Sequence, residues 1–345
     1  MNGVIRETFA LGVKQFNQLK FMQIINKWIT FFNPEQFQGW GRKKRYFEGW
    51  YYKMVSAGET KAIAVIPGIA MDETGKKQAF IQVLDGRKHT SEYFRFDAEQ
   101  FRPQARKFQF SIADNHFSLD TIHLELPVLS GELHFSGMVP WPKPWYSPGI
   151  MGPYAFVPFM ECYHGIVSMD HSIEGKLQWN GGSVDFSGGR GYTEKDWGLS
   201  FPSAYIWMQS NHFSRPGISL KLSVANIPWI RKAFVGFIAG LWLDGRLIRF
   251  TTYNKSVLRK SSVSAELVEL IIENQSYRLW IRAYREKATE LASPIHGFME
   301  GRIEESMTST IDVELFDRKR RVIVFKDTGR NAGLEVAGNI QEIIL

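Results

Sequence analysis

The sequence predicts an all-β protein, and three observations support that prediction. Aromatic residues make up 14% of the 345 residues, with 26 Phe and 11 Trp, and such side chains favour sheet surfaces over helical bundles. From Tyr46 onward, short apolar or alternating runs are separated by Gly, Asp, Asn and Pro, which is typical of strands joined by turns. Three segments have the composition of hairpin turns: Asp85-Gly86, Asn180-Gly181-Gly182 and Asp244-Gly245. A chain of this length is expected to form two domains or one large β domain.

Residues 1–33 are expected to form an amphipathic helix ahead of the β region. Its apolar side chains recur at near-helical spacing, at Val13, Phe16, Leu19, Ile24, Trp28 and Phe31. The segment has no signal-peptide pattern, and its lysines interrupt any membrane span. Two interpretations stay open: the helix packs on the protein body, or residues 8–32 lie on a membrane surface.

The segment FEGWYYK, residues 47–53, is expected to be a strand whose side chains alternate between two faces. One face then carries Glu48, Trp50 and Tyr52. A carboxylate between aromatic rings is unfavourable in a core unless it is paired or protonated. Glu48 is therefore either held by an Arg across the sheet or part of a functional site.

Residues 138–159, MVPWPKPWYSPGIMGPYAFVPF, are rich in proline and aromatic side chains. Proline cannot donate a hydrogen bond within a sheet, so these residues cannot form a central strand. We expect an ordered loop that covers or lines another part of the protein. A domain boundary is expected near residues 200–220, where it would divide the strands about equally.

Residues 160–175, MECYHGIVSMDHSIEG, carry the densest group of polar side chains. Glu161 is a candidate acid whose pKa would be raised by its surroundings. His164, Asp170 and His171 are metal-ligand types, but no HExxH motif or other spacing forces them together, and no metal site is predicted. Cys162 beside His164 is the alternative, as a nucleophile.

Residues 192–213, YTEKDWGLSFPSAYIWMQSNHF, place carboxylates beside aromatic rings. In the first part, Tyr192, Glu194 and Asp196 share one face, and Lys195 and Trp197 share the other. In the second part, one face of a strand carries Tyr205, Trp207, Gln209, Asn211 and Phe213. Amides among aromatic rings are typical of a cavity that holds an apolar ligand and orients its polar atoms. The alternative is an aromatic core in which both amides bind backbone groups.

Other classes of function find little support. The net charge is +7, but the basic run at residues 318–321 lies between two apolar β-type runs, as in a solvated hairpin tip, so no nucleic-acid partner is predicted. The alternative for this run is attraction to anionic lipid. No nucleophile elbow, Walker loop or dinucleotide motif is present, and no cofactor is predicted. Cys162 is the single cysteine, which excludes an intrachain disulfide and fits a reducing, cytoplasmic location.

Two of these segments, FEGWYYK and YTEKDWGLSFPSAYIWMQSNHF, resemble the tocopherol cyclase family. The resemblance extends from about residue 34 and leaves the first 33 residues outside. It implies two tandem lipocalin-like β-barrels, here expected at residues 34–205 and 206–345, and a relationship to carotenoid hydratases of the hydroxyneurosporene type. It also implies closure of a chromanol ring on a prenylated hydroquinone without a redox cofactor or metal.

Such a cyclisation constrains the site, because protonating an alkene requires a neutral, desolvated acid of raised pKa. The candidate acids are Glu48, Glu161 and Asp196. Asp196 stands where the plant pattern has Asn, so Glu48 and Glu161 are the stronger candidates. Aromatic faces stabilise a carbocation, and amides can orient a quinol head. The candidate substrate-binding residues are Trp50, Tyr52, His164, Tyr192, Trp197, Trp207, Gln209 and Asn211.

The sequence therefore predicts a cyclase- or hydratase-type enzyme that acts on a lipophilic isoprenoid or prenyl quinol. It would be cytoplasmic, with a peripheral membrane contact through residues 8–32. Two alternatives stay open: a non-catalytic carrier of a lipophilic molecule, and a carbohydrate-binding or carbohydrate-cleaving β-sandwich.

Overall fold

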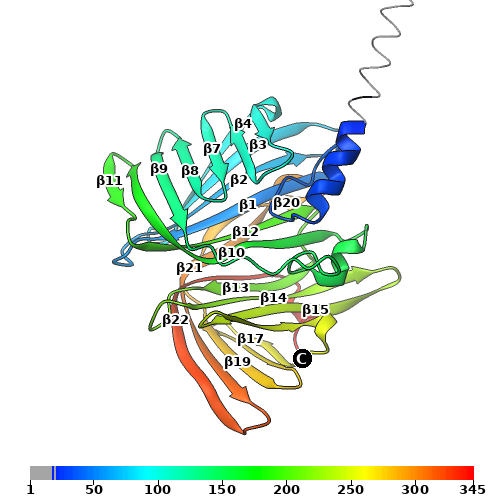
Figure 1. The fold of residues 1–345 in the computed structure, drawn as a ribbon, viewed down its shortest axis with the longest axis vertical. Coiled ribbons are helices and arrows are strands. Elements are labelled where there is room, and N and C mark those ends of the chain that lie inside the picture. Colours follow the sequence, from blue (N-terminus) through cyan, green and yellow to red (C-terminus); the bar gives the residue numbers. More distant parts are fainter. Residues whose placement is uncertain (1–17, 19–20) are drawn as a thin grey trace, which may run out of the picture.

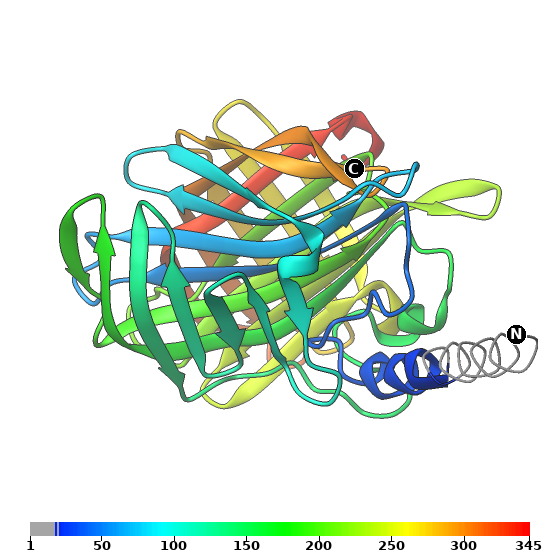
Figure 2. The same cartoon turned by 90° about the horizontal axis from the view of Figure 1, so that it is seen from above.

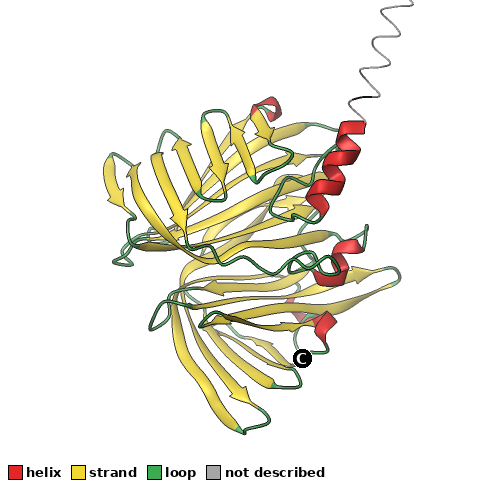
Figure 3. Cartoon of the chain, in the orientation of Figure 1, coloured by secondary structure: helices red, strands yellow, loops and turns green. Residues whose placement is uncertain are grey.

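The computed structural model describes residue 18 and residues 21–345, which form one helix packed beside two large antiparallel sheets (Figures 1 and 3). The helix covers residues 21–31, and everything from Tyr46 to Gly338 is built from strands and their connections. The prediction of an all-β protein with an N-terminal helix is confirmed.

The first sheet has twelve strands in the order β4-β3-β2-β1-β12-β10-β9-β8-β7-β6-β5, with β11 paired to β10. Its strands are β1 (Tyr46–Val55), β2 (Ala62–Met71), β3 (Lys77–Asp85), β4 (Thr90–Phe96), β5 (Phe101–Pro103), β6 (Gln109–Ile112), β7 (Asn115–Ser118), β8 (Thr121–Glu125), β9 (Leu129–Ser136), β10 (Cys162–Trp179), β11 (Gly182–Asp185) and β12 (Gly189–Gly198). A 3-10 turn, η1 (Ala98–Gln100), joins β4 to β5.

The second sheet has ten strands in the order β16-β15-β14-β13-β22-β21-β19-β18-β17, with β20 paired to β21. Its strands are β13 (Ala204–Ser210), β14 (Ile218–Trp229), β15 (Lys232–Leu243), β16 (Arg246–Thr251), β17 (Val257–Val263), β18 (Leu267–Glu273), β19 (Tyr277–Tyr284), β20 (Thr289–Ile295), β21 (Phe298–Asp317) and β22 (Val322–Gly338). Short 3-10 turns are η3 (Thr252–Asn254) and η4 (Ile340–Glu342).

Two of the predicted turns have the backbone that a two-residue hairpin needs. Asn180 and Gly181 connect β10 to β11, and Asp244 and Gly245 connect β15 to β16, all with φ between +50° and +82°. Positive φ at both central positions matches the twist of the flanking strands, and Asn-Gly and Asp-Gly tolerate it best. At Asp85, by contrast, β3 ends and a longer turn follows.

Each sheet curls around its own apolar core, and a third apolar layer lies where the two sheets face each other (Figures 1 and 2). Strand alternation decides which layer a residue enters. Along β1, Trp50 and Tyr52 belong to the core of the first sheet, whereas Tyr51 belongs to the layer between the sheets. Along β13, Ile206 and Met208 enter the second core, and Tyr205 and Trp207 face the first sheet.

The chain passes from the first sheet to the second between Gly198, where β12 ends, and Ala204, where β13 begins. This crossing lies a few residues before the expected boundary at 205/206. The division into domains at that boundary stays a prediction.

Residues 138–159 form the expected ordered loop, which includes the 3-10 turn η2 (Gly152–Phe156). The loop reaches into the layer between the sheets, where Trp141 is 1% exposed. Gly152 has a φ of +56°, and a Cβ there would lie 2.5 Å from the Tyr253 ring, so only glycine permits this approach of loop and second sheet.

The N-terminal helix contacts the body through a narrow stripe. Asn26 and Thr30 are buried, whereas the predicted apolar positions Ile24 and Trp28 are 54% and 69% exposed. Val13, Phe16 and Leu19 lie outside the described residues. Within residue 18 and residues 21–345, no helix combines the length and apolar composition that a bilayer span requires.

Candidate functional site

A cavity lies between the two sheets, and its lining is mostly apolar and aromatic. The first sheet contributes Tyr51, His164, Glu194 and Asp196, and the second contributes Tyr205, Trp207, Lys221, Glu305 and Glu335. We call this the inter-sheet cavity. Ionisable side chains therefore face an apolar space from two walls, an environment in which pKa values shift strongly.

The pairing of β10 with β12 builds the polar part of the first wall. His164 lies directly opposite Asp196 in the register, and Glu194 lies two residues further along the same face of β12. A register shift after Ile166 then carries the later residues of β10 out of this alignment. The sequence brings these three side chains together only because the two strands pair in this register.

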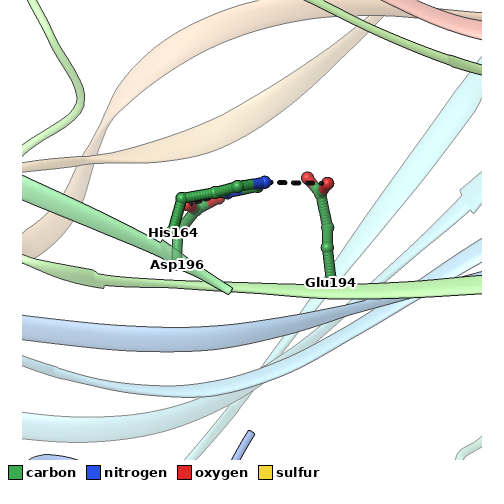
Figure 4. A group of neighbouring side chains, drawn as sticks. All are labelled: His164, Glu194 and Asp196. Carbon is green, nitrogen blue, oxygen red and sulfur yellow. Dashed lines mark hydrogen bonds and ion pairs between the residues drawn. The ribbon is translucent and has the colours of Figure 1, made fainter. Parts of the chain in front are cut away.

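His164 lies between two carboxylates (Figure 4). Its Nδ1 lies 2.6 Å from Asp196 Oδ1, and its Nε2 lies 3.3 Å from Glu194 Oε2. The second contact is within ion-pair distance but lacks hydrogen-bond geometry, so the buried Nε2 has no hydrogen-bond partner. Burial and Lys221 both act to lower the pKa of His164, but Asp196 and Glu194 outweigh them and hold this pKa above its ordinary value.

Glu194 accepts hydrogen bonds from both walls of the cavity. Trp207 Nε1 donates to its Oε2 at 3.1 Å, and the Tyr192 hydroxyl donates to the same oxygen. Burial acts to raise the pKa of Glu194, but the nearby His164 and Lys221 and the Tyr192 hydrogen bond overcome it and lower the pKa. Glu194 is thus an anion at neutral pH inside an apolar cavity.

Glu305 and Glu335 form a carboxyl pair on the second wall. They lie directly opposite each other in the register of β21 and β22, so both project from the same face. Tyr51 donates to Glu305, and the Tyr205 hydroxyl donates to Glu335 at 2.7 Å. Burial raises the pKa of Glu305 to about 7, and burial with the charge of Glu305 raises the pKa of Glu335 well above its ordinary value. This carboxyl pair therefore keeps a proton at neutral pH.

Of the predicted site residues, His164, Asp196 and Trp207 line the inter-sheet cavity. Tyr192 lies behind it and supports Glu194. Gln209 accepts from Lys53 Nζ at 3.1 Å, and Asn211 donates to Asp170 and to the Gly191 carbonyl, so both amides are buried outside the cavity lining.

Other predicted residues belong to the first sheet's core. Trp50 and Tyr52 are buried there, and Trp197 stacks on Tyr163 with the ring centroids 5.5 Å apart. Glu48 is fully buried and paired with Lys195, not with an Arg, at 2.5 Å. Glu161 lies in the loop before β10, outside the lining, and burial raises its pKa.

The cavity residues not predicted from sequence as site residues are Glu194, noted only for its position beside Asp196, and Lys221, Glu305 and Glu335. Lys221 alternates with Ser219 and Ser223 along β14, a pattern that normally indicates a solvent face. Here that face is covered by the first sheet, so Lys221 is fully buried. Only the packing of one sheet on the other turns a polar face into a buried site.

Among the described residues, one group of side chains is close enough to hold a metal ion: the ligand atoms of His164, Glu194 and Asp196 lie within 4.8 Å of one another. The set His164, Asp170 and His171 does not converge. Asp170 pairs with Arg190, and His171 packs on Phe135. In the converging group, Nδ1 of His164 is engaged with Asp196, which leaves Nε2, beside Glu194, as the ring nitrogen that could bind an ion.

Comparison with known proteins identifies the family of the chain and solved structures that share its fold. A family model described as tocopherol cyclase-like matches residues 132–338. Over 199 residues the chain is 25% identical to a chloroplastic tocopherol cyclase of Zea mays, and 23% identical to a probable chloroplastic tocopherol cyclase of Oryza sativa subsp. japonica. These alignments cover 54% of this chain but only 41% and 42% of the relatives, so the match spans about two fifths of their length.

Solved structures share the architecture. CghA with Sch210972 superposes with a TM-score of 0.53 at 10% identity, covering 85% of this chain and 89% of CghA. An AttH-type protein of Nitrosomonas europaea gives a TM-score of 0.51 at 13% identity, covering 85% and 92%. Identities this low bear on the fold alone, and they confirm the predicted lipocalin-like fold. The tocopherol cyclase-like family model matches more than half of the residues of this chain, so the chain belongs to that family.

Proposed function

We propose that the chain is a cofactor-independent cyclase that acts on an isoprenoid or prenylated quinol in the inter-sheet cavity. The observation that carries this proposal is the separation of pKa values across the cavity. The carboxyl pair Glu305/Glu335 keeps a proton, whereas Glu194 on the facing wall is an anion. Two carboxyl sites with opposite protonation at one pH are what acid and base roles require.

In the proposed reaction, the carboxyl pair transfers a proton to one alkene carbon of the prenyl chain. The other alkene carbon becomes a tertiary cation, and the pair is left with an added negative charge. The phenol oxygen then bonds to the cation and releases its proton to Glu194. Return of that proton to the carboxyl pair, through solvent or through the cavity, restores the starting state. No oxidant or reductant is consumed.

Aromatic rings support the cationic step. Tyr51 and Trp207 lie edge to face with ring centroids 5.6 Å apart, and both line the inter-sheet cavity. Their faces carry negative quadrupole charge, which attracts a carbocation more strongly in an apolar space than in water. If water reached the cation before the phenol did, the same acid would produce hydration instead of cyclisation.

The proposal reassigns the roles expected from sequence. Glu48 accepts from Tyr46 and from the Gln38 and Gly39 amides, besides pairing with Lys195. With its oxygens so occupied, Glu48 has a structural role. Asp196 keeps a site role through His164, and Glu305 and Glu335 take the acid role. A cytoplasmic location stays a prediction, and the names of the curated relatives place those proteins in the chloroplast.

The test is turnover of a prenylated hydroquinone by the purified chain, read by mass spectrometry of the chromanol product. Glu335→Gln should reduce kcat by about 100-fold or more while ligand binding persists, because the amide cannot donate the proton. Glu161→Gln is the matched control, since Glu161 has a raised pKa but lies outside the cavity. Binding without conversion by the unmodified chain would support a carrier and contradict the proposal.

A further inference from the structure

Exposed apolar side chains gather at one end of the molecule. They come from the helix (Phe21, Met22, Ile24, Trp28 and Phe32), the proline-rich loop (Trp145, Tyr146, Phe156 and Phe159) and the β14–β15 hairpin tip (Ile230). Trp145, Ile230 and Trp28 are 79%, 78% and 69% exposed. Large exposed apolar groups on separate segments are a sign of an interaction surface when they adjoin one another.

Contacts between the segments show that they adjoin. Phe31 of the helix lies 5.2 Å from Phe156 of η2, and Trp229 of the hairpin lies 5.4 Å from Phe159, measured between ring centroids. The helix, η2 and the β14–β15 tip lie at the same end in both views of the ribbon (Figures 1 and 2). We call the surface made by residues 21–32, 145–159 and 229–232 the docking face.

The docking face is basic. Its residues 21–32, 145–159 and 229–232 include Lys27, Arg231 and Lys232 and no Asp or Glu. Arg231 and Lys232 stand exposed directly beside Ile230, and Lys27 is exposed on the helix. Aromatic and basic side chains are interspersed on this face. The aromatic ones suit the acyl boundary of an anionic lipid surface, and the basic ones suit its headgroups.

The docking face is continuous with the inter-sheet cavity. Tyr154 and Phe234 line the cavity, and their rings lie 6.0 and 5.9 Å from the Trp229 ring at the base of the hairpin tip. An apolar path of side chains therefore runs from the exposed end of the molecule to the cavity lining. A water-soluble ligand would not need an apolar path to reach the inter-sheet cavity. A lipophilic ligand that enters from a bilayer would need one.

We infer that the docking face binds the surface of an anionic lipid bilayer and sets the inter-sheet cavity against it. Trp28, Trp145 and Ile230 enter the boundary between headgroups and acyl chains, and Lys27, Arg231 and Lys232 contact lipid phosphates. The inference extends the sequence-based expectation for residues 8–32 to three separate segments. It does not depend on the proposed chemistry, because lipid binding is measured without turnover.

The experiment is co-sedimentation of the full chain with vesicles of phosphatidylcholine alone and with equimolar phosphatidylcholine and phosphatidylglycerol. Binding to the mixed vesicles is expected to be stronger and to weaken with added salt. The double variant Trp28→Ser with Ile230→Ser should lose at least about tenfold in affinity for them. Circular dichroism checks that this variant stays folded, and both positions are exposed.

A matched control lies on the β21–β22 hairpin. Ile323 is 52% exposed beside the basic run at residues 318–321, but its hairpin is outside the docking face. Ile323→Ser and Arg320→Glu with Arg321→Glu should leave vesicle binding unchanged, whereas Arg231→Glu with Lys232→Glu should weaken it.

Three results would overturn the inference. One is equal binding to both lipid compositions, or to neither. Another is an equal loss of binding in the Ile323→Ser control. The third is a dimer of the unmodified chain, seen by light scattering, that Trp28→Ser with Ile230→Ser dissociates, since a second copy would then cover the face.

Discussion

At the residue scale, buried glutamates serve two different purposes in this protein. Glu48 and Lys195 form an ion pair in the first core, and the Tyr46 hydroxyl and the Gln38 amide also donate to Glu48. Glu305 and Glu335 have tyrosine donors but face a cavity. Burial raises both pKa values, and the charge of Glu305 adds to the rise at Glu335. Burial is common to both cases, and the difference is that Glu48 has a cation in direct contact.

The carboxyl pair Glu305/Glu335 should make kcat depend on pH. Its groups must be protonated to act as acids, so kcat should fall as pH rises through the raised pKa of Glu305, which is about 7. The groups that face the pair are Tyr51 and Lys53 of β1, Glu194 of β12 and Tyr205 of β13. Lys53, whose pKa burial lowers to about 7, loses charge in the same range and lets the pair retain its proton to higher pH.

The measurement is a pH–rate profile with prenylated hydroquinone as substrate. Lys53→Met should move the falling limb to higher pH, because the cation that favours the anionic carboxylates is gone. A limb that rises with pH across this range would contradict an acid role for Glu305 and Glu335.

At the element scale, β1 and β12 depend on a buried ion pair. The Lys195 ammonium donates to the Pro34 carbonyl at 2.9 Å besides pairing with Glu48, and it lies over the rings of Trp50 and Trp197. It therefore joins the segment after the helix to the central strands of the first sheet. Burial raises the pKa of Glu48 and lowers that of Lys195, since both charges have left water.

Removing one member of the Glu48–Lys195 pair should destabilise the folded protein. Lys195→Met leaves Glu48 buried without its partner, and the free energy of unfolding should fall by about 3–5 kcal/mol. Urea denaturation measures this, with Lys176→Met as control because the Lys176–Asp185 pair is exposed on both sides. If Glu48→Gln combined with Lys195→Met is no more stable than Lys195→Met alone, an uncompensated charge is not the cause.

At the scale of the whole molecule, the apolar layer between the sheets packs the first sheet against the second. The proline-rich loop contributes Trp141 to it, and a Cβ at Gly240 of β15 would lie 2.4 Å from the Trp141 ring. Glycine at that position lets the loop from the first sheet press directly on the second. Because the cavity walls come from both sheets, any change in their packing also changes the site.

Trp141→Ala should therefore lower the free energy of unfolding by about 3–5 kcal/mol, the usual cost of emptying a buried Trp site. It should also separate the melting of the two sheets, since their mutual packing is weakened. Scanning calorimetry measures both effects. Trp145→Ala on the same loop is the control, and its exposed side chain predicts a change within about 0.5 kcal/mol. A single sharp transition in Trp141→Ala would contradict this role.

Local patterns in the sequence were enough to predict several elements. Alternation and turn composition identify the strands around residues 47–53 and 192–198, and the hairpins at Asn180-Gly181 and Asp244-Gly245. Proline content identifies the loop at 138–159. These features are local, because backbone preference and side-chain period act over a few residues.

The site required more than local pattern. His164 and Asp196 were recognised as candidates, but nothing within the sequence of β21 or β22 distinguishes Glu305 and Glu335 from carboxylates on a solvent face. Lys221 among serines gives the same ambiguous pattern. A polar face looks identical in sequence whether water or another sheet covers it, because alternation reports only that two faces differ.

By itself, then, the sequence determined that this is an antiparallel β protein of the tocopherol cyclase-like family, with aromatic and acidic side chains concentrated in a few strands. Only the tertiary structure decided which of those acids meet. The register of β10 with β12 joins His164 to Asp196, the register of β21 with β22 joins Glu305 to Glu335, and sheet packing closes the cavity between them. The physical reason is that a pKa depends on what surrounds a group in space, and these neighbours come from separate strands: 32 residues separate His164 from Asp196, and 254 separate Tyr51 from Glu305.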